Sequence, residues 1–555
     1  MERVWFKHYE EGVPRTLAYP DVPLYHLLEE TVRKYPSNTA TIFLNNRMSY
    51  KELNDHVNQL ANAFIGLGIR KGDRVAIYLP NCPQYVITYY AILKAGAVVV
   101  PFNPLYAARE VEHQLKDSGA ETIVVLSRFY PTVQGVRANT GLKNVIVTNI
   151  KEYFPPLIKF LFTLLKEKKE GHRVKLQAGD HWFQDLLARY PATKPDVEVT
   201  ASDTACLLYT GGTTGVPKGA ELSHRNLVAN TMQTKAWFAK AQEGAEVILT
   251  SLPLFHSYGM TTCMNNAIYL SSAMILIPNP RDLKDVLKNI DKHQPTIFPG
   301  VPTMYVAINN FPDIGKYDLS SIKACISGAA GLPVEVQTKF QALSGGKLVE
   351  GYGLSEASPV THANPLFGLN KIGTIGLPFP DTDVKIVDVE TGQKELPVGE
   401  TGELVIKGPQ VMKGYWNRPE ETKNTLRAGW LYTGDIAKMD EDGYFAIVDR
   451  KKDMIIAGGF NIYPREIEEV LYEHPKVEEV CVAGIPDPYR GETVKAYIVL
   501  KEGQTATVEE IRDFCRENMA RYKVPTDIEF RSELPKTMVG KILRRVLVEE
   551  EMKKN

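Results

Sequence analysis

The chain carries the stretch YTGGTTGVPKGAELSH at residues 209–224, which follows an apolar run and precedes a segment of helical character. Backbone N–H groups approach a phosphate closely where no Cβ obstructs them, and hydroxyls and a lysine add donors and charge. A surface turn needs only about two to four such residues. Here the pattern runs from Thr210 to Ala220. The stretch therefore predicts a polyphosphate-binding loop between a strand and a helix, with Lys218 against the phosphate charge.

The loop is not a Walker A motif, because that motif requires serine or threonine directly after glycine and lysine. In this chain Lys218 follows Pro217 and precedes Gly219. The sequence thereby argues against a simple P-loop kinase or GTPase.

Outward from the loop, short apolar runs alternate with helix-length segments. The runs RVAIYLP, AVVVPFNP and ETIVVLS are separated by QYVITYYAILKAG and REVEHQLKDSG, and the rhythm returns at EVILTSLPLF and IKACISGAAGLP. This alternation predicts βαβ units and a largely parallel sheet. Residues 372–449 instead show short strand-like runs with glycine turns, and the remaining residues read as a compact α+β domain. We therefore expect an α/β fold, with an N-terminal domain over 1–449, β-rich at about 372–449, and a small mobile C-terminal α+β domain over 450–555.

Composition narrows the class of ligand. Lysine and arginine total 65 against 66 aspartates and glutamates in 555 residues, so no global positive charge draws the protein to nucleic acid. Six scattered cysteines show no CxxC spacing, which argues against a zinc site and fits a reducing compartment. The first residues lack the pattern of a signal peptide. We expect a cytoplasmic protein with small-molecule ligands.

The segment 154–170 qualifies this expectation, because a short apolar run ends there in a cluster of lysines. It is shorter than the roughly 20 residues that a membrane span needs. Two interpretations stay open: peripheral contact with a membrane surface, or a buried helix followed by a solvated turn.

Further motifs follow the loop in order. They are PLFHSYG at 253–259, SGAA at 327–330, EGYGLSE at 350–356, YTGD at 432–435, DRKKDMIIAGGFNIYPREIE at 449–468 and PKTMVGKILRR at 535–545. With the loop, they resemble the adenylate-forming superfamily of acyl-CoA synthetases, luciferases and peptide-synthetase adenylation domains, and most of all its medium- and long-chain fatty-acid-CoA ligases. The resemblance covers nearly the whole chain. It implies that a carboxylic acid attacks ATP, with Mg2+, to give an acyl-adenylate and pyrophosphate, after which coenzyme A takes the acyl group and AMP leaves.

The resemblance also implies roles for individual residues. The β and γ phosphates are expected at Thr210, Gly211, Gly212, Thr213, Thr214 and Lys218, and magnesium at Thr210 and Glu356. Family members usually carry a hydroxyl residue where this chain has Gly211, so one side-chain contact with phosphate is in question. Other nucleotide contacts are expected from Gly328, Ala329, Glu350, Gly351, Tyr352, Ser355, Asp435, Arg450, Lys452 and Lys541, with Tyr352 stacking on adenine and Asp435 and Arg450 holding the ribose.

The resemblance assigns catalysis chiefly to Lys541, whose ammonium would bridge the attacking carboxylate and the α-phosphate. Lys218 and Glu356 join it as catalytic residues, and so does His256, which would line the acyl pocket. Lys452 falls at the hinge position, where a rotation of the small domain would exchange the groups that the two half-reactions need.

The predicted acyl pocket decides the substrate. Its stretches HSYGM, GVPTMY and SGAAG are small and apolar, which favours a medium- or long-chain fatty acid. An aromatic-acid CoA ligase of coumarate or benzoate type and a luciferase-like adenylating enzyme remain alternatives. A non-enzymatic acyl-binding scaffold is disfavoured, because Glu356 and Lys541 are present. The sequence leaves a homodimer open.

Overall fold

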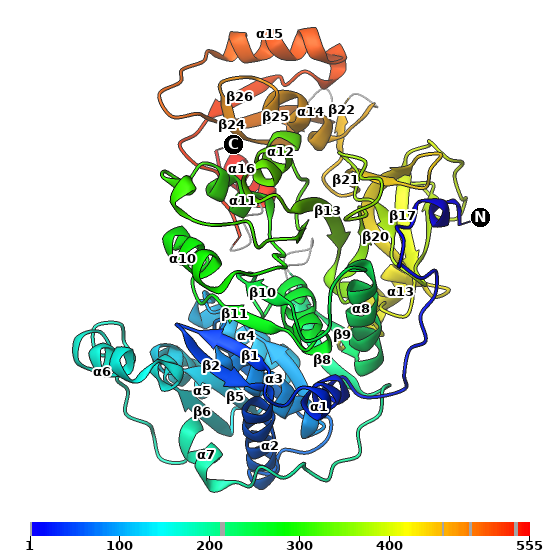
Figure 1. The fold of residues 1–555 in the computed structure, drawn as a ribbon. Coiled ribbons are helices and arrows are strands. Elements are labelled where there is room, and N and C mark those ends of the chain that lie inside the picture. Colours follow the sequence, from blue (N-terminus) through cyan, green and yellow to red (C-terminus); the bar gives the residue numbers. More distant parts are fainter. Residues whose placement is uncertain (1–2, 211–216, 458–459, 488–490, 538–541, 555) are drawn as a thin grey trace. The chain divides into compact units, whose positions relative to one another are not determined.

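The computed structural model describes residues 3–210, 217–457, 460–487, 491–537 and 542–554 (Figure 1). The chain divides into two compact units. The large unit consists of Phe6–Asp383 and Lys407–Gly429, and the small unit consists of Met1–Trp5, Val384–Ile406 and Trp430–Asn555.

An eight-stranded sheet forms the centre of the large unit. Its order is β18 (Gly414–Tyr415), β9 (Lys218–Ser223), β8 (Thr204–Thr210), β4 (Val98–Pro101), β3 (Arg74–Tyr78), β5 (Thr122–Leu126), β6 (Asn144–Thr148) and β7 (His181–Trp182). The strands from β8 to β7 pair in parallel, and β9 and β18 extend this edge in antiparallel pairing. The apolar runs predicted as buried strands therefore form the parallel part of this sheet.

Helices accompany the sheet: α2 (Tyr50–Gly66), α3 (Pro83–Lys94), α4 (Ala108–Ser118), α5 (Tyr130–Arg137), α6 (Pro156–Leu165) and α7 (Phe183–Arg189). A capping box starts α2, in which the Ser49 side chain accepts from the N–H of Glu52 and the Glu52 carboxylate accepts from Ser49. All residues of α3 are buried, and Gln84, Thr88 and Lys94 are its polar members among apolar and aromatic side chains.

Two further sheets complete the large unit. One is ordered β10 (Val247–Thr250), β11 (Ala273–Leu276), β1 (Thr39–Phe43) and β2 (Asn46–Ser49); the other is ordered β12 (Ala324–Ser327), β13 (Lys347–Gly353), β14 (Val360–Ala363) and β15 (Leu377–Pro378). The remaining helices of the large unit are α1 (Tyr25–Lys34), α8 (His224–Trp237), α9 (Asn266–Tyr269), α10 (Leu283–His293), α11 (Pro302–Asn309), α12 (Val334–Ser344) and α13 (Pro419–Thr425), with a π-helical stretch at Gly259–Asn265. Ile275, Phe298, Tyr305, Phe340 and Leu348 lie in one buried cluster of this region.

The small unit holds two sheets. The first contains β16 (Asp383–Val387), β17 (Gly402–Lys407), β20 (Trp430–Met439) and β21 (Phe445–Arg450). The second contains β23 (Phe460–Ile462), β22 (Ile455–Ala457), β25 (Gly491–Leu500), β24 (Val477–Asp487) and β26 (Asp527–Phe530), with helices α14 (Pro464–Tyr472), α15 (Val508–Asn518) and α16 (Arg544–Met552). None of the helices within the described residues is long and apolar enough to cross a bilayer.

The α/β class, the parallel strands and the α+β character of the C-terminal residues agree with the sequence expectations. The structure groups residues 384–406 and 430–449 in one compact unit with 450–555. The domain boundary expected at Arg450 stays a prediction.

Burial of His224 makes the stability of the large unit depend on pH. Its side chain is 1% exposed, and its Nδ1 accepts a hydrogen bond from the N–H of Leu24 at 3.0 Å. Burial lowers the pKa of His224 from 6.5 to about 4. The neutral form is therefore favoured in the fold. Its contribution is complete above about pH 6.5 and is lost as the pH falls toward 4, by about 3 kcal/mol in all.

We expect His224→Gln to flatten the fall of the apparent Tm between pH 6.5 and 4, because glutamine accepts the Leu24 N–H but does not titrate. Calorimetry over this range measures the slope. His26→Gln, on a side chain that is 40% exposed, is the matched control and should keep the wild-type slope. Equal slopes for wild type and His224→Gln would contradict this account.

Candidate functional site

The glycine-rich loop leaves the carboxyl end of β8 and returns as β9, so the prediction that a helix follows it directly is wrong: α8 begins only at His224, after β9. Thr210, the last residue of β8, pairs with Lys218, the first residue of β9. Because β8 is parallel to β4, the loop leaves at the carboxyl ends of the parallel strands, where α/β sheets bind ligands. Four residues predicted to contact phosphate, Gly211, Gly212, Thr213 and Thr214, lie outside the described residues, whereas Thr210 and Lys218 bracket them.

Lys218 lies against an aromatic ring rather than in solvent. Its Nζ is 5.6 Å from the centroid of the Tyr415 ring, and its side chain is 17% exposed. A carboxylate oxygen of Glu421 is 3.9 Å from the same Nζ, at the outer limit of an ion pair. A cation held over a ring and only loosely neutralised is suited to an anionic ligand.

The same tyrosine reaches the predicted magnesium ligand. The Tyr415 hydroxyl donates a hydrogen bond to Oε1 of Glu356 at 2.7 Å. Burial, and then the charge of Glu356, raises the pKa of Tyr415 well above its usual range, so the hydroxyl keeps its proton. Tyr415 is positioned by β18, where it pairs with Ala220 of β9. One side chain thus connects the lysine expected at phosphate with the carboxylate expected at the metal.

The oxygen donors fit a magnesium ion that is bound together with phosphates. Glu356 offers a carboxylate and Thr210 a hydroxyl, both hard ligands. Within the residues that the structure describes, no three histidine, cysteine, aspartate or glutamate side chains cluster in a way that would hold a metal by themselves. Magnesium commonly takes one or two carboxylates and completes its coordination with water and substrate phosphates.

The motifs SGAA and EGYG meet at the ends of two parallel strands. Ser327 of β12 is paired with Glu350 of β13, so Gly328 and Gly351 follow at the same sheet edge. A Cβ at Gly351 would lie 2.7 Å from Cγ2 of Ile326, and one at Gly328 would lie 3.0 Å from the ring of Tyr258. Packing inside the large unit therefore leaves no free space for a side chain at Gly351 and little at Gly328. Their expected contact with adenine stays a prediction.

Neighbouring residues at this edge differ in their environment. Ala329 is exposed and has a φ of 71°, in the left-handed region that alanine rarely adopts. The Glu350 carboxylate is buried and accepts the N–H of Leu332 at 3.1 Å. Tyr352 is half-buried, and its ring lies edge-on to that of His362 at 5.9 Å. Glu350 thus has a structural role in addition to the expected nucleotide contact.

His256 lies in a turn that the protein holds firmly. Its Nδ1 accepts the N–H of Tyr258 at 3.2 Å, and the next residue, Ser257, is 3.2 Å from the hydroxyl of Ser355. The side-chain amide of Asn81 donates to the carbonyls of Thr250 and Leu252, and its oxygen accepts the N–H of Leu254. The predicted acyl-pocket loop is therefore positioned by hydrogen bonds and is in contact with the EGYGLSE motif.

In the small unit, the structure brings Asp435 and Arg450 together. They are paired across β20 and β21, and the guanidinium Nε is 3.6 Å from the Asp435 carboxylate. Lys452 follows at an exposed position. Lys541 lies outside the described residues, although Lys536 and Ile542 on either side of it form a bridge.

Arg544 of α16 fixes the chain after Arg450. Its guanidinium is 2.7 Å from Asp453 and from Glu468, and 3.8 Å from Asp449. Burial raises the pKa of Asp449 to about 6 despite this cation. The predicted hinge segment is thus anchored on both sides of Lys452, through the buried Asp449 and the partly exposed Asp453, by the Arg544 guanidinium.

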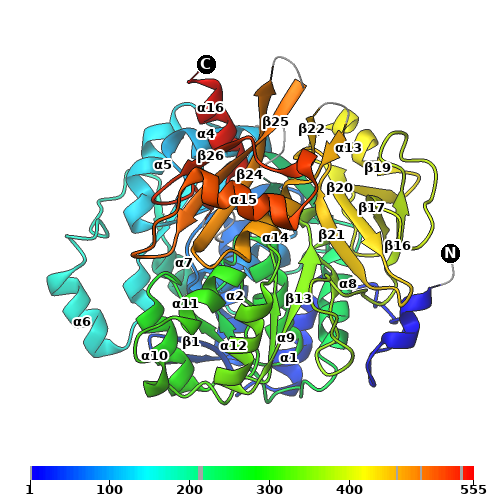
Figure 2. The same cartoon turned by 90° about the horizontal axis from the view of Figure 1, so that it is seen from above.

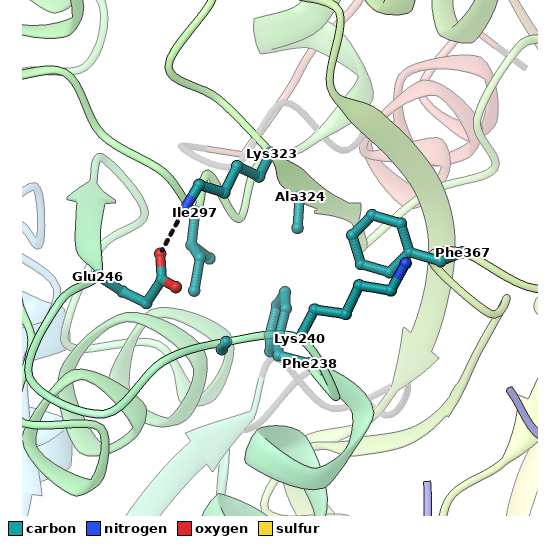
Figure 3. Close-up of a pocket in the computed structure, with 8 residues that line it drawn as sticks. Phe238, Lys240, Glu246, Ile297, Lys323, Ala324 and Phe367 are labelled. Atoms are coloured by element: carbon teal, nitrogen blue, oxygen red, sulfur yellow. Dashed lines mark ion pairs between the residues drawn. The ribbon is translucent and has the colours of Figure 1, made fainter. Parts of the chain in front are cut away.

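Two cavities of the large unit lie away from these groups. One of about 30 Å³, about the size needed for one water molecule, is lined by Phe238, Lys240, Ala241, Glu246, Ile297, Lys323, Ala324 and Phe367 (Figure 3). Its Glu246 carboxylate lies 3.7 Å from Lys323. Another, of about 280 Å³, lies near the amino ends of β3, β4 and β8, beside Lys71 and Trp416. Neither contains a residue that the sequence predicts to be functional.

Two residues that organise the site, Tyr415 and Asn81, are not among those predicted from the sequence. Tyr415 lies in GYWNRPEET, a stretch to which the sequence assigned no role. Asn81 follows β3 in LPNCP, a polar residue between a buried strand and a helix. The position of Asn81, a polar residue directly after a buried strand, could have indicated its role. Nothing in the sequence around Tyr415 indicated a contact with Glu356.

Comparison with known proteins places these features in context. Residues 28–416 match the AMP-binding enzyme family, and residues 466–541 match the AMP-binding enzyme C-terminal domain. A long-chain-fatty-acid–CoA ligase from Bacillus subtilis is 49% identical over 99% of this chain and 98% of its own, and one from Yersinia pestis is 42% identical over 100% and 99%. The crystal structure of an anthranilate CoA ligase in complex with anthranoyl-AMP has a TM-score of 0.84 and 28% identity, covering 96% of this chain and 98% of its own.

The Tyr415 hydroxyl provides a direct test of the site. We expect Tyr415→Phe to raise the Kd for magnesium–ATP about tenfold, because a hydrogen bond to a charged group is lost and Glu356 is no longer oriented. Isothermal titration calorimetry in magnesium buffer measures this. Tyr209→Phe is the matched control, since it removes a hydroxyl–carboxylate bond of the same 2.7 Å length, to Asp117, and should change the Kd less than about twofold. Equal affinities for Tyr415→Phe and wild type would refute the orienting role.

Proposed function

The chain belongs to the AMP-binding enzyme family, and we propose on this basis that it is an ATP-dependent, AMP-forming long-chain-fatty-acid–CoA ligase. The observation that carries the proposal is the arrangement of Lys218, Tyr415 and Glu356 beside the glycine-rich loop. The full-length likeness to long-chain-fatty-acid–CoA ligases favours a fatty acid as the substrate. ATP, magnesium and coenzyme A are the cofactor and cosubstrates of this reaction.

In the first half-reaction, a carboxylate oxygen of the fatty acid forms a bond to the α-phosphorus of ATP, and the bond to pyrophosphate breaks. Lys218 and Thr210 hold the outgoing phosphates in this proposal, with the loop between them. Glu356, oriented by Tyr415, is the carboxylate that holds magnesium. The bound ion supplies positive charge that offsets the charge on the phosphates. No enzyme nucleophile is needed, since positioning and charge lower the barrier.

The nucleoside part of ATP is assigned to the remaining predicted residues. Asp435 accepts hydrogen bonds from the ribose hydroxyls, and its pairing with Arg450 presets its orientation. Adenine is assigned to the edge formed after β12 and β13, where Tyr352 offers a half-buried ring.

In the second half-reaction, the thiol of coenzyme A attacks the acyl carbon, the thiol proton leaves, and AMP departs with the electrons of the broken acyl–oxygen bond. We assign Lys541 to the first half-reaction, in which its ammonium bridges the carboxylate and the α-phosphate. Lys452 is the hinge at which the small domain turns to withdraw Lys541 before the thiol enters.

The acyl chain is assigned to the buried residues that follow His256 in the sequence. Tyr258, Met260 and Cys263 are buried there, and Met260 and Cys263 belong to the π-helical stretch. Stretches of π-helix are frequent at functional sites. Peripheral membrane contact through 154–170 is a further part of this proposal, and the homodimer that the sequence leaves open stays a prediction.

The substrate assignment is tested by following acyl-CoA, AMP and pyrophosphate with acids from acetate to oleate, and with benzoate and coumarate. We expect the largest kcat/KM with acids of long aliphatic chain, because the assigned pocket buries apolar surface in proportion to chain length. A preference for benzoate or coumarate would establish the aromatic-acid alternative. An acyl-adenylate that coenzyme A cannot discharge would contradict the ligase.

If Lys541 acts only in the first half-reaction, its loss should slow acyl-adenylate formation much more than the transfer of the acyl group to coenzyme A. We expect Lys541→Ala to slow acyl-adenylate formation about 100-fold or more, because a charge at the reacting phosphate is lost. Conversion of supplied acyl-adenylate and coenzyme A to acyl-CoA should stay within about threefold of wild type. Lys553→Ala, at an exposed position near the chain end, is the control. Equal losses in both steps would remove Lys541 from its assigned role.

A further inference from the structure

Helix α6 (Pro156–Leu165) turns its apolar stripe away from the protein. The exposed fractions are 70% for Leu157, 60% for Phe160, 45% for Leu161, 65% for Leu164 and 70% for Leu165. These positions recur at i, i+3, i+4, i+7 and i+8, which is the spacing of one helix face. In α6, Phe162 alone is buried. The buried helix that the sequence left as an alternative is therefore not what the structure contains.

The opposite side of α6 attaches it to the large unit. The ring of Phe162 packs edge-on against Phe154 at 5.3 Å and against His172 at 5.6 Å. The Lys159 ammonium is 2.6 Å from the Glu152 carboxylate. In both views α6 stands at the margin of the large unit, outside the helices that cover the sheet (Figures 1 and 2). The orientation of the stripe is thus fixed by contacts and does not result from a loose segment.

A basic segment continues from the carboxyl end of the helix. Its exposed cations are Lys166, Lys168, Lys169, Arg173 and Lys175. Two acidic side chains interrupt it. Glu167 is buried and lies 2.5 Å from Lys151 and 3.5 Å from Arg173, and Glu170 lies 3.8 Å from Lys166. The surface beside the apolar stripe therefore carries net positive charge.

We infer that α6 and residues 166–175 form a docking surface for an anionic lipid bilayer. Apolar side chains of an amphipathic helix insert at the boundary of headgroups and acyl chains, and neighbouring lysines meet anionic headgroups. The helix has ten residues, so it spans about 15 Å and is too short to cross the roughly 30 Å of hydrocarbon. It lies on the membrane rather than through it.

Charge favours a lipid surface over a second copy of the chain as the occupant. In a twofold-symmetric contact, each copy presents the same patch to the other. The basic segment would then meet the same basic segment or lie beside it, and like charges at an interface oppose association. An anionic bilayer complements both the leucine-rich stripe and the lysines.

The inference adds a source of substrate to the proposed ligase and, in that respect, rests on the proposed function. Long-chain fatty acids partition into bilayers because each buried CH2 group is favourable by about 0.8 kcal/mol. An enzyme docked through α6 takes its acid from the layer in which it is concentrated. Binding to the bilayer itself requires neither ATP nor coenzyme A.

The test is flotation of the full-length protein with vesicles of phosphatidylcholine alone or containing phosphatidylglycerol, without substrates. We expect binding to the anionic vesicles that weakens when salt is raised from 0.1 to 0.5 M, on the principle that salt screens exposed charges. Absence of binding to anionic vesicles, or equal binding to both compositions, would overturn the proposal.

Two pairs of substitutions separate the contributions. Lys168→Glu with Lys169→Glu should weaken binding more than about 20-fold, since each lysine near an anionic surface contributes about fivefold. Leu157→Ser with Leu164→Ser should weaken it about tenfold. The matched controls are Leu105→Ser, at a leucine 58% exposed outside α6, and Lys284→Glu with Lys292→Glu, at exposed lysines of α10. Controls that weaken binding as much as the α6 variants would refute the location.

Two further measurements keep the inference separate from the proposed ligase. Sedimentation velocity without lipid should show no loss of association in the leucine variant; a wild-type dimer that this variant dissociates would identify a second copy as the occupant. Activity should fall in the α6 variants with vesicle-bound oleate and stay unchanged with water-soluble octanoate. Vesicle binding without any ligase activity would support the docking surface and contradict the proposed function alone.

Discussion

The antiparallel pairing of β9 with β8 on one side and β18 on the other is the constraint on which the candidate site depends. It joins the two ends of the glycine-rich loop by pairing Thr210 with Lys218. It also seats Tyr415 opposite Ala220, from where its ring lies beside the Lys218 ammonium and its hydroxyl reaches Glu356. Backbone hydrogen bonds thereby place a cation, an aromatic ring and a carboxylate in one arrangement. Of these groups, the cation suits a phosphate and the carboxylate suits the divalent cation bound with it, and the ring of Tyr415 lies between the two.

Much of this arrangement could be predicted from the sequence, because each motif carries its own local chemistry. The glycine-rich loop, the apolar runs of the parallel strands and the acidic and aromatic residues of EGYGLSE are recognisable without partners. Tyr415 could not be assigned in this way. Its importance depends on a pairing of residues 220 and 415 that no periodicity reveals. The sequence predicted Gly328 and Gly351 as contacts of adenine. Their packing against Tyr258 and Ile326 favours glycine at both positions whether or not adenine lies nearby.

Helix α6 shows most clearly what the order of apolar and charged residues cannot predict. A short apolar run followed by lysines has the same composition whether it is buried or exposed, because composition does not state which face the fold covers. The contacts of Phe162 with Phe154 and His172 decide the question, and they turn the leucines outward. In a protein whose proposed substrate concentrates in membranes, an exposed apolar stripe beside lysines has a physical use. The same surface would otherwise be a liability for aggregation.

Exchange of labelled pyrophosphate into ATP, with magnesium and oleate but without coenzyme A, tests the central claim most directly. Exchange requires that the enzyme form the acyl-adenylate reversibly and hold it, so it isolates the chemistry assigned to the loop, Lys218 and Glu356. The account predicts exchange that depends on oleate, with a loss of about 100-fold in Glu356→Gln. Exchange that Glu356→Gln leaves intact would contradict the assigned site, and no exchange with any acid would contradict the adenylating ligase itself.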